Sequence, residues 1–540
     1  MRDFMTLSRR RFLGHGARLS LSAFIPACSD EGGGASCCTG SASTFEHGVA
    51  SGDPLADAVI LWTRVTPPDT AVEQLSSIDV EWRVASDPEM TRVIATGSAP
   101  TDAESDYTVK VDVGGLQPGT TYYYDFAALA VRSRVGRTKT LPSGEAERAR
   151  LAVVSCANFP AGFFTVYRAI AARLDLDLVL HLGDYLYEYA NATFGDGTAI
   201  DRLPEPDREL VTLEDYRARH AQYKRDADLQ ELHRQHPLLA IWDDHEIANN
   251  GFRDGAGNHQ PDSEGDWLVR KQSAMRAYFE WMPIRPASPG DEQRIYRQFA
   301  YGDLFDLLML DTRYAGRDAR IGTNCDRVGI DDPARSMLGA EQEVWLLDGL
   351  RASHARGAGW RLVAQQVMMG QLSDVARGCV THPDQWDGYA PSRARVLALL
   401  RDEAIDNVVV LTGDAHSSWA FDLAENPFDA EAYDGATGQG SLAVEFVTPS
   451  VSSPASFVGD GEGPATHPHL KYMDLVRHGY VLVDVTRESV QAEWYHVSSV
   501  LEPRADEALG ASFRVLAGQN CLVPAETATE AKATAAAPAP

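Results

Sequence analysis

The chain has 540 residues, of which 44% are hydrophobic and 23% are charged, and its formal net charge is −28. This length exceeds one ordinary domain and predicts two or three, and the composition is that of a globular protein. The negative charge disfavours nucleic acid and anionic membrane surfaces as main partners, because both repel the chain. We therefore expect no nucleic-acid-binding role.

The first 44 residues predict an export signal followed by a linker. The sequence 8-SRRRFL-13 precedes a short, weakly apolar stretch, 19–28, which cannot span a bilayer as a stable anchor. Paired arginines with Phe-Leu resemble the signal of the twin-arginine machinery, which exports folded proteins. We expect that machinery as a partner and a periplasmic or extracellular location. A plain basic tail is the alternative.

Cys28 ends the sequence 25-IPAC-28, which loosely resembles a lipoprotein cleavage site. Lipidation of Cys28 and simple cleavage nearby both remain open, and a lipid anchor there would be the expected membrane contact. Seven cysteines do not make a disulfide scaffold in so long a chain, although Cys325 and Cys379 could pair outside the cytoplasm. We expect a monomer.

Residues 45–142 predict a β-sandwich domain. Short apolar runs such as 59–62, 80–84 and 108–113 are separated by turn residues. The sequence 111-VDVGGLQPGTTYYYDF-126 matches the strand–turn–strand corner of fibronectin-type sandwiches. Alternation places Tyr122 and Tyr124 on one face of their strand, so packing explains these tyrosines better than ligand binding does.

From residue 148 to residue 500 the pattern changes to strands that alternate with helices, which predicts a largely parallel or mixed sheet with helices outside. The expected strands are 150–155, 176–182, 238–242, 304–310, 361–365, 407–411, 442–448, 479–486 and 489–496. The expected helices are 164–173, 212–225, 265–281 and 339–352. Residues 501–540 form a C-terminal segment whose low-complexity end, 524–540, predicts disorder.

Side chains that can bind metal or phosphate follow five of these strands. They are Cys156 and Asn158; Asp184 and Tyr187, with Glu188; Asp243, Asp244 and His245, with Asn249; Arg313; and Asp414 and His416. In open α/β sheets, ligands bind at the carboxyl ends of the strands, where such loops converge. Four ionisable groups at 243–246 are costly to bury together, and a cation removes that cost. The set as a whole predicts a polynuclear metal site.

The same segments carry a resemblance. Gly-Asp-x-x-Tyr, then Asp-His-Glu, then Gly-x-x-His resembles the calcineurin-like metallophosphoesterases. The segments 46–65, 154–159, 181–188, 241–250, 337–346, 386–393 and 412–419 more closely resemble PhoD-like alkaline phosphatases, a family also described as phosphodiesterases or phospholipase D. The resemblance implies an α/β fold with a metallophosphoesterase-type mixed β-sheet sandwich flanked by helices, after an N-terminal all-β domain of fibronectin or immunoglobulin type.

The resemblance also implies an iron(III)–calcium centre. Asp184 would bridge the metals, with Cys156, Tyr187 and His416 on the iron side and Asp244 and Asp414 on the calcium side. Thiolate and phenolate ligands suit Fe(III), and carboxylates suit Ca²⁺. Asp243 is either a further ligand or a hydrogen-bond acceptor for one. A histidine ligand common in the wider superfamily has no evident match here, so one coordination position stays open.

The expected activity is hydrolysis of phosphomonoesters, phosphodiesters or both by a metal-activated hydroxide. His245 would protonate the leaving oxygen, Arg313 and Arg393 would contact phosphate, and Asn158 and Asn249 would help to bind substrate. Two alternatives remain: a metal-dependent hydrolase of another ester class, and a surface binding protein with a degenerate site. The sequence does not distinguish a monoester, diester or phospholipid substrate.

Overall fold

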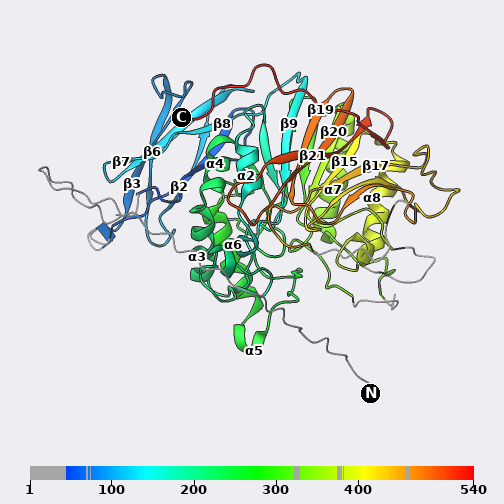
Figure 1. Cartoon of the computed structure of the whole chain (residues 1–540), viewed down its shortest axis with the longest axis horizontal. Coiled ribbons are helices and arrows are strands. Elements are labelled where there is room, and N and C mark those ends of the chain that lie inside the picture. Colours follow the sequence, from blue (N-terminus) through cyan, green and yellow to red (C-terminus); the bar gives the residue numbers. More distant parts are fainter. Residues whose placement is uncertain are drawn as a thin grey trace, which may run out of the picture. The chain divides into compact units, whose positions relative to one another are not determined.

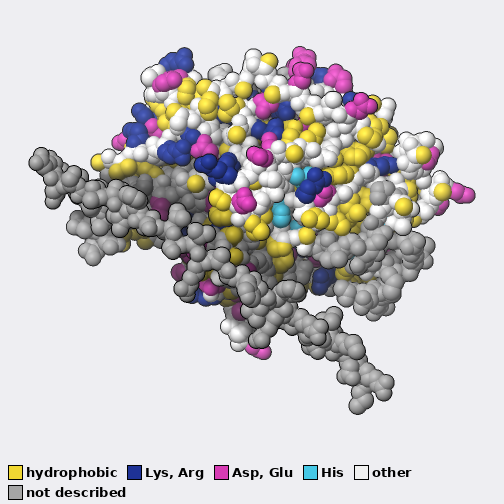
Figure 2. Space-filling model, viewed as in Figure 1, with side chains coloured by type: hydrophobic (Ala, Val, Ile, Leu, Met, Phe, Trp, Pro, Cys, Tyr) yellow, Lys and Arg dark blue, Asp and Glu magenta, His cyan; other side chains and the backbone are white. Residues whose placement is uncertain are grey.

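The computed structural model describes residues 44–68, 71–72, 75–321, 329–373, 380, 382–455, 463 and 465–540. The paired arginines, Cys28, Cys325 and Cys379 lie outside these residues, so the predictions made for them are left as they stand. Every helix within the described part of the chain is too short or too polar to traverse a lipid bilayer. On the face shown in Figure 2, acidic and basic side chains are interspersed, so the acidity of the chain does not gather into one patch there.

Ten strands form the larger sheet (Figure 1). Its order is β22 (Leu522–Pro524), β21 (Glu507–Leu516), β20 (Ser489–Val497), β19 (Gly479–Thr486), β9 (Arg148–Val154), β10 (Leu178–His181), β11 (Leu238–Ala240), β1 (Val49–Gly52), β2 (Ala58–Arg64) and β5 (Thr108–Gly114). Strands β9, β10, β11 and β1 run parallel to one another. Their near-continuous apolar sequences are typical of parallel strands that are covered on both faces.

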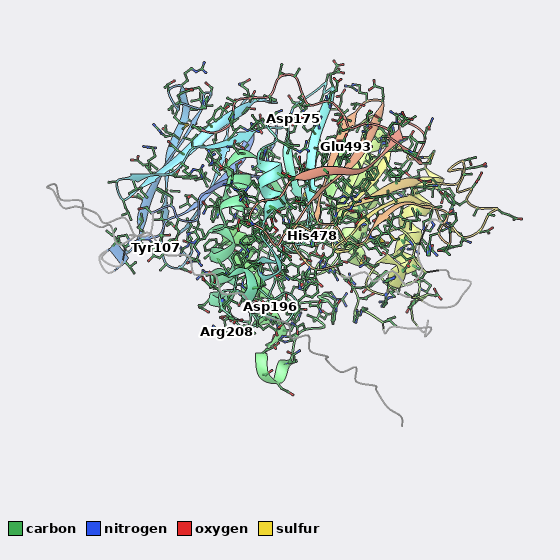
Figure 3. All side chains as sticks on the ribbon, in the orientation of Figure 1. Tyr107, Asp175, Asp196, Arg208, His478 and Glu493 are labelled. Carbon is green, nitrogen blue, oxygen red and sulfur yellow. The ribbon has the colours of Figure 1, made fainter. Side chains whose placement is uncertain are left out.

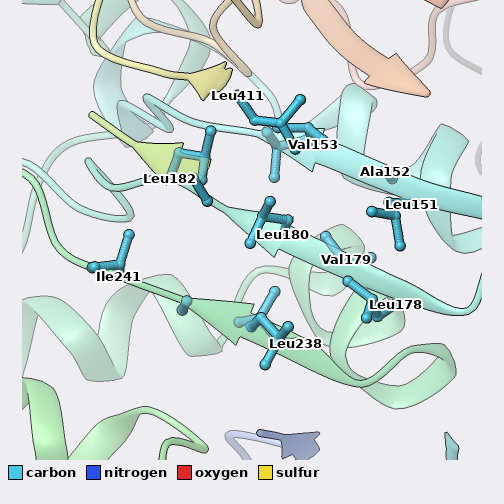
Figure 4. Close-up of a cluster of buried hydrophobic side chains, with 14 of the residues drawn as sticks. Leu151, Ala152, Val153, Leu178, Val179, Leu180, Leu182, Leu238, Ile241 and Leu411 are labelled. Carbon is cyan, nitrogen blue, oxygen red and sulfur yellow. The ribbon is translucent and has the colours of Figure 1, made fainter. Parts of the chain in front are cut away.

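Seven strands form a second sheet. Its order is β12 (Arg297–Tyr301), β13 (Phe305–Met309), β14 (Trp360–Gln365), β15 (Val408–Thr412), β17 (Ala443–Val447), β16 (Ser418–Leu423) and β18 (Leu470–Asp474). The two sheets share one hydrophobic core. In Figure 4, Leu411 of β15 lies close to Val153 and Leu182, which come from β9 and the end of β10. The carboxyl ends of the parallel strands in both sheets therefore reach a common region.

Helices cover the outer faces of this pair of sheets. The helices α2 (Thr165–Ala171), α3 (Leu213–Lys224), α4 (Ala227–Gln235) and α6 (Trp267–Trp281) pack against the ten-stranded sheet. The helices α7 (Gly339–Ala355) and α8 (Ala390–Asp402) pack against the seven-stranded sheet, and α5 (Pro261–Glu264) is a short turn before α6. Helix α3 begins at Thr212 with a reciprocal capping box to Asp215, which satisfies otherwise unpaired backbone donors. The predicted mixed α/β fold is confirmed.

The N-terminal region forms the expected β-structure, but it is continuous with the large sheet. The strands β3 (Ile78–Ala85), β4 (Val93–Thr101), β6 (Thr121–Ala128), β7 (Val131–Arg132) and β8 (Gly136–Lys139) form a third sheet, and Tyr122 and Tyr124 of β6 enter one core, as alternation predicts. Strands β1, β2 and β5 supply the facing residues of that core. Because β1 also pairs with β11, at Gly52 and Leu238, hydrogen bonding continues across the predicted boundary at 142–148.

The C-terminal segment differs from its predicted disorder. Residues 507–524 supply β21 and β22, and the chain then lies along the N-terminal region and α4. The Tyr123 hydroxyl donates to the Ala537 carbonyl at 2.6 Å, Arg234 donates to the Pro540 carbonyl at 2.7 Å, and Lys532 pairs with Asp177. Backbone carbonyls make most of these contacts, and a composition rule does not detect them because it considers side chains alone.

Candidate metal centre

The predicted ligands come together where the parallel strands end. Cys156 follows β9, Asp184 and Tyr187 follow β10, Asp243 and Asp244 follow β11, and Asp414 and His416 follow β15. All these residues except Asp414 are buried, and Asp414 is only partly exposed. Three sets of their ligand atoms lie within 4.8 Å of one another: Cys156, Asp184 and His416; Asp184, Asp244 and His245; and Asp243, Asp244 and Asp414. We call the residues of these three sets the ligand cluster. Asp184 belongs to two of the sets and therefore links them.

Unusual backbone geometry points these side chains inward. Cys156, Asp184, Asp414 and His416 have φ angles of 65°, 53°, 55° and 52°, in the left-handed region that residues other than glycine seldom adopt. Such conformations cluster at functional sites, where surrounding structure holds them in place. Gly183 has φ of 101°, and a Cβ atom there would lie 2.4 Å from Cβ of Asp243. A glycine is thus required for the loops after β10 and β11 to touch.

On one side of Asp184 lie Cys156, Tyr187 and His416, which we call the thiol–phenol side. The Tyr187 hydroxyl is 3.0 Å from Oδ2 of Asp184 and 3.0 Å from Nε2 of His416. Burial, followed by the charge of Asp184, raises the pKa of the Cys156 thiol and of the Tyr187 phenol well above their usual values. A bound cation would reverse this effect, because it favours the thiolate and the phenolate.

On the other side lie Asp243, Asp244 and Asp414, which we call the carboxylate side. Burial is the main cause that raises the pKa of all three carboxyl groups, and neighbouring carboxylates raise it further. Oδ2 of Asp243 and Oδ1 of Asp244 are buried and have no hydrogen-bond partner among the described residues. Crowded, unpartnered oxygen atoms of this kind fit a hard cation such as Ca²⁺.

Arg313 lies within the carboxylate side. Its guanidinium donates to Asp243, to Oδ1 of Asp414 at 2.7 Å and to Oδ2 of Asp384 at 2.8 Å, and its side chain is fully buried. These carboxylates raise the pKa of Arg313 well above its usual value although burial opposes them. Arg313 therefore supplies a permanent positive charge among the carboxylates. Asp384, in the sequence 382-HPDQW-386, was not predicted as part of the site.

His245 is held by Glu188, which follows Tyr187 in the loop after β10. Nδ1 of His245 is 2.7 Å from Oε2 of Glu188, whose Oε1 accepts the backbone N–H of Asn249 at 2.7 Å. Burial opposes protonation of His245, but Glu188, Asp244 and Asp184 raise its pKa well above 6.5. Nε2 lies on the other side of the ring, 4.0 Å from Oδ1 of Asp244. Asn249 thus contributes its backbone to the orientation of His245.

Two predicted substrate-binding residues have other contacts. Nδ2 of Asn158 donates to the Phe194 carbonyl at 2.5 Å. Asn158 therefore anchors the loop that carries Phe194. Arg393 donates to Oδ1 of Asp387 at 2.7 Å and to the Met369 carbonyl at 3.2 Å, and no contact of Arg393 with the ligand cluster is observed among the described residues.

Phe194 forms part of the rim of the cluster. Its half-buried ring is nearly parallel to that of His245, with an interplanar angle of 13° and centroids 6.2 Å apart. The ring also lies 5.7 Å from His416 and 5.9 Å from Tyr187. This residue belongs to the segment 190–211, which lies between β10 and α3. In Figure 3, Asp196 of this segment lies in the lower part of the view and His478 lies near the middle, while Asp175, which precedes β10, lies near the top.

Two residues that support the candidate ligands were given no individual role in the sequence prediction. Glu246 accepts the backbone N–H groups of Asp184 at 3.0 Å, Tyr185 at 2.6 Å and Asp243 at 2.8 Å, so it binds the loops after β10 and β11 together. The Ser453 hydroxyl donates to the Tyr187 oxygen at 2.7 Å. The only sequence signals were the acidic run at 243–246 and the small polar residues of 450-SVSSP-454.

A second group of buried ionisable side chains lies on the other side of the loop after β10. His181, His220, Lys224 and His233, which we call the histidine–lysine cluster, surround Tyr185. Nε2 of His233 is 2.9 Å from the Tyr185 hydroxyl and 3.0 Å from Nζ of Lys224. Burial lowers the pKa of His181 and His220 to about 3, and it lowers the pKa of Lys224 well below its usual value.

Comparisons with known proteins agree with this geometry. Residues 151–494 match a sequence model described as PhoD-like phosphatase, and residues 35–142 match its N-terminal domain. Alkaline phosphatase D of Bacillus subtilis (strain 168) is 36% identical over 488 residues, which are 87% of this chain and 80% of that protein. A solved structure of PhoD superposes with a TM-score of 0.82 and 33% identity, and the match covers 91% of this chain and 94% of that one.

The fold and the clustered side chains, together with these matches, define a hydrolase of phosphoric esters. Within that class, the chain belongs to the PhoD-like phosphatase family.

Proposed function

We propose that the chain is an exported phosphoesterase that uses a mixed metal centre to hydrolyse phosphomonoesters, phosphodiesters or both. The observation that carries this proposal is the asymmetry of the ligand cluster. One side offers a thiol, a phenol and an imidazole, the other offers three carboxylates, and Asp184 is shared by ligand groups on both sides.

This asymmetry supports Fe(III) on the thiol–phenol side and Ca²⁺ on the carboxylate side. Cys156, Tyr187 and His416 would hold iron, and Asp243, Asp244 and Asp414 would hold calcium. The donor types match the preferences of the two ions. When bound, the metals supply positive charge for the phosphate oxygens and acidify a water molecule for attack on phosphorus.

His245 is the proposed proton donor for the leaving oxygen. The hydrogen bond between its Nδ1 and Glu188 sets the direction of the ring, which leaves Nε2 facing the ligand cluster. General acids of this kind contribute roughly 100- to 10,000-fold. His245→Ala should therefore reduce turnover by at least about 100-fold while metal content is kept. Wild-type turnover in this variant would show that His245 is not the proton donor.

Arg313 is proposed to balance charge in the metal centre. Nε, Nη1 and Nη2 of its guanidinium each donate to a carboxylate, so the contacts observed support charge balance over direct phosphate binding. Arg393, which pairs with Asp387, is proposed to order the segment before α8.

Elemental analysis of the protein, purified after export in its folded form, tests the metal assignment. Iron near one equivalent together with calcium is the expected result. Zinc or manganese in place of iron would overturn the assignment and leave the phosphoesterase class intact. Hydrolysis of 4-nitrophenyl phosphate against bis(4-nitrophenyl) phosphate then separates monoesterase from diesterase activity.

Export by the twin-arginine route is a separate proposal. It rests on Arg9 and Arg10 followed by Phe12-Leu13. Replacement of both arginines by lysine keeps the charge, and it should retain the protein inside the cell. Unchanged export of the double-lysine variant would overturn the route. Mass determination of the exported chain shows whether Cys28 carries lipid.

A further inference from the structure

A short turn, residues 450–454, packs against the thiol–phenol side of the ligand cluster. We call this segment the serine turn. The Val451 N–H donates to the Ser155 carbonyl at 3.0 Å, and the N–H groups of Ser452 and Ser453 donate to the Cys156 carbonyl at 3.3 and 3.2 Å. These bonds attach the turn to the end of β9, directly beside the thiol. The turn is therefore part of the framework of this side.

The serine turn also contacts the other two side chains of the thiol–phenol side. Nδ1 of His416 is 2.8 Å from the Pro454 carbonyl, which leaves Nε2 directed toward Tyr187 and Asp184. The Ser453 hydroxyl lies 2.7 Å from the Tyr187 oxygen. His478, labelled in Figure 3, has its Nε2 3.0 Å from the Ser453 carbonyl and so helps to hold the turn. One turn thus contacts Cys156, Tyr187 and His416.

The protons available at this point limit how Ser453 can act. Its hydroxyl has one proton and two acceptors, the Cys156 carbonyl at 2.9 Å and the Tyr187 oxygen at 2.7 Å. As a phenol, Tyr187 donates its own proton to Oδ2 of Asp184 at 3.0 Å. As a metal-bound phenolate, it can only accept. A charged acceptor forms the stronger hydrogen bond, so the phenolate should attract the serine proton.

We propose that Ser453 is a positioning residue that tunes Tyr187 as an iron ligand, an inference that rests on the proposed iron assignment. A hydrogen bond to the phenolate oxygen withdraws electron density, so Tyr187 donates less to Fe(III). The remaining positive charge on the metal is then larger, which favours binding of a phosphate oxygen. Hydrogen bonds to metal ligands tune metal sites in this way, and those to the sulfur ligands of iron–sulfur clusters help to set reduction potentials.

Ser453→Ala removes this bond, and Ser452→Ala is its matched control. Ser452 lies in the same turn and is also buried, but its hydroxyl donates to the Asn158 carbonyl at 2.9 Å and to no ligand side chain. Both variants lose one buried hydroxyl of the same turn. Only the first loses a bond to Tyr187, so the pair separates ligand tuning from general damage to the turn.

Visible absorption and reductive titration of the metal-loaded protein are the measurements. A phenolate bound to Fe(III) gives a charge-transfer band, and a stronger phenolate donor moves that band to longer wavelength and lowers the Fe(III)/Fe(II) reduction potential. We expect both shifts in Ser453→Ala, with iron content kept and kcat reduced by about 10-fold. Ser452→Ala should have the band position and reduction potential of the wild type. Ser453→Thr should return the band to its wild-type wavelength. If Ser453→Ala does not retain iron, Ser453→Cys, a weaker donor of similar size, should show the shift.

The outcomes separate this inference from the proposal beneath it. If the wild type binds iron and Ser453→Ala has the same band and reduction potential, the role of Ser453 is overturned and the iron assignment stands. Where Ser453→Ala loses iron, an unchanged band and potential in Ser453→Cys have the same meaning. Equal shifts in Ser453→Ala and Ser452→Ala also overturn it, because the effect would then come from the turn as a whole. A wild-type protein without iron and without a visible band overturns the iron assignment, and this inference with it.

Discussion

The two buried clusters on either side of residues 184 and 185 differ in whether their ionisable side chains are charged. Asp184 faces the ligand cluster, where His245 and His416 lower its pKa against the effect of burial, and where Glu188 raises the pKa of His245. Tyr185 faces the histidine–lysine cluster, where burial lowers the pKa of His181, His220 and Lys224. Asp184 thus enters a charged site, whereas its neighbour Tyr185 enters a site in which the basic groups are neutral.

The difference shows that burial alone does not remove charge. In the ligand cluster, Asp184, Glu188, His245 and Arg313 each lie beside an opposite charge, so their ionised forms persist although burial opposes them. In the histidine–lysine cluster no carboxylate contact with these basic groups is observed among the described residues, so the neutral forms are favoured. A metal site needs the first kind of environment, and a structural core tolerates the second.

The largest effect should come from Asp184→Asn, which changes the residue shared by ligand groups on both sides of the ligand cluster. Metal content should fall on both sides, and turnover should drop on the order of 1,000-fold, because the charge that stabilises bound metal and substrate is lost. Metal analysis and assay of a chromogenic phosphoester measure this. Asp196→Asn, at an exposed position, is the control. Retention of both metals by Asp184→Asn would show that the sides are independent.

Removal of the fixed cation should have the next largest effect. Arg313→Met leaves buried carboxylates without their partner and should destabilise the metal-free protein by about 3 kcal/mol. Added Ca²⁺ should recover more stability in this variant than in the wild type, because calcium then replaces the positive charge that Arg313 supplies to the carboxylate side. Denaturant unfolding with and without calcium measures both effects, with the exposed Arg401→Met as control. Equal stability of variant and wild type would contradict the charge-balance role.

A smaller, pH-dependent effect is expected in the histidine–lysine cluster. Burial lowers the pKa of His220 from 6.5 to about 3, so between these values the unfolded chain binds a proton that the folded chain does not. Stability from this residue is therefore complete above pH 6.5 and is lost as the pH falls toward 3, by about 2 kcal/mol at pH 5. The unfolding free energy of His220→Phe should decline less than that of the wild type between pH 8 and pH 5. Parallel declines would show that His220 is charged when folded.

The smallest effect should come from the rim of the ligand cluster. Phe194→Ala should reduce kcat/KM for 4-nitrophenyl phosphate about fivefold, or about 1 kcal/mol, through lost aromatic contact with the leaving group. An activated alkyl ester, 2,2,2-trifluoroethyl phosphate, should be much less affected. The half-buried Phe428 provides the control substitution to Ala. Equal losses for the aryl and alkyl esters would mean that Phe194 supports the loop and not the substrate.

Hydrophobic periodicity was sufficient to locate most of the catalytic fold. The strands β9, β10, β13, β14, β15, β17, β19 and β20 and the helices α2, α3, α6 and α7 lie within a few residues of their predicted positions. Helices α4 and α8 were not predicted. Helix α4 has the sequence ADLQELHRQ, with few apolar residues, and α8 begins with Ala390-Pro391. Short or proline-led helices give a weak periodic signal, and contacts with neighbouring elements decide whether they form.

The candidate ligands were more accessible to sequence reasoning than the residues that support them. Cys156, Asp184, Asp244 and His416 directly follow strong strand signals, and the sheet itself brings them together. Glu246 and Ser453 act through hydrogen bonds to backbone or to another side chain, and Asp384 pairs with an arginine 71 residues away. Such contacts have no characteristic spacing, so only the folded structure reveals them.

The pairing of β1 with β11 has a practical consequence for anyone who wishes to study the catalytic part alone. Cutting the chain near residue 145, between the two matched family segments, would remove β1, β2 and β5 and leave β11 as an open sheet edge. The unpaired N–H and C=O groups of β11 would form hydrogen bonds with strands of other chains. The loop that carries Asp243 and Asp244 starts from that strand. A shortened protein of this kind should be prone to aggregation and should lose its ligand geometry, even though every ligand residue is retained.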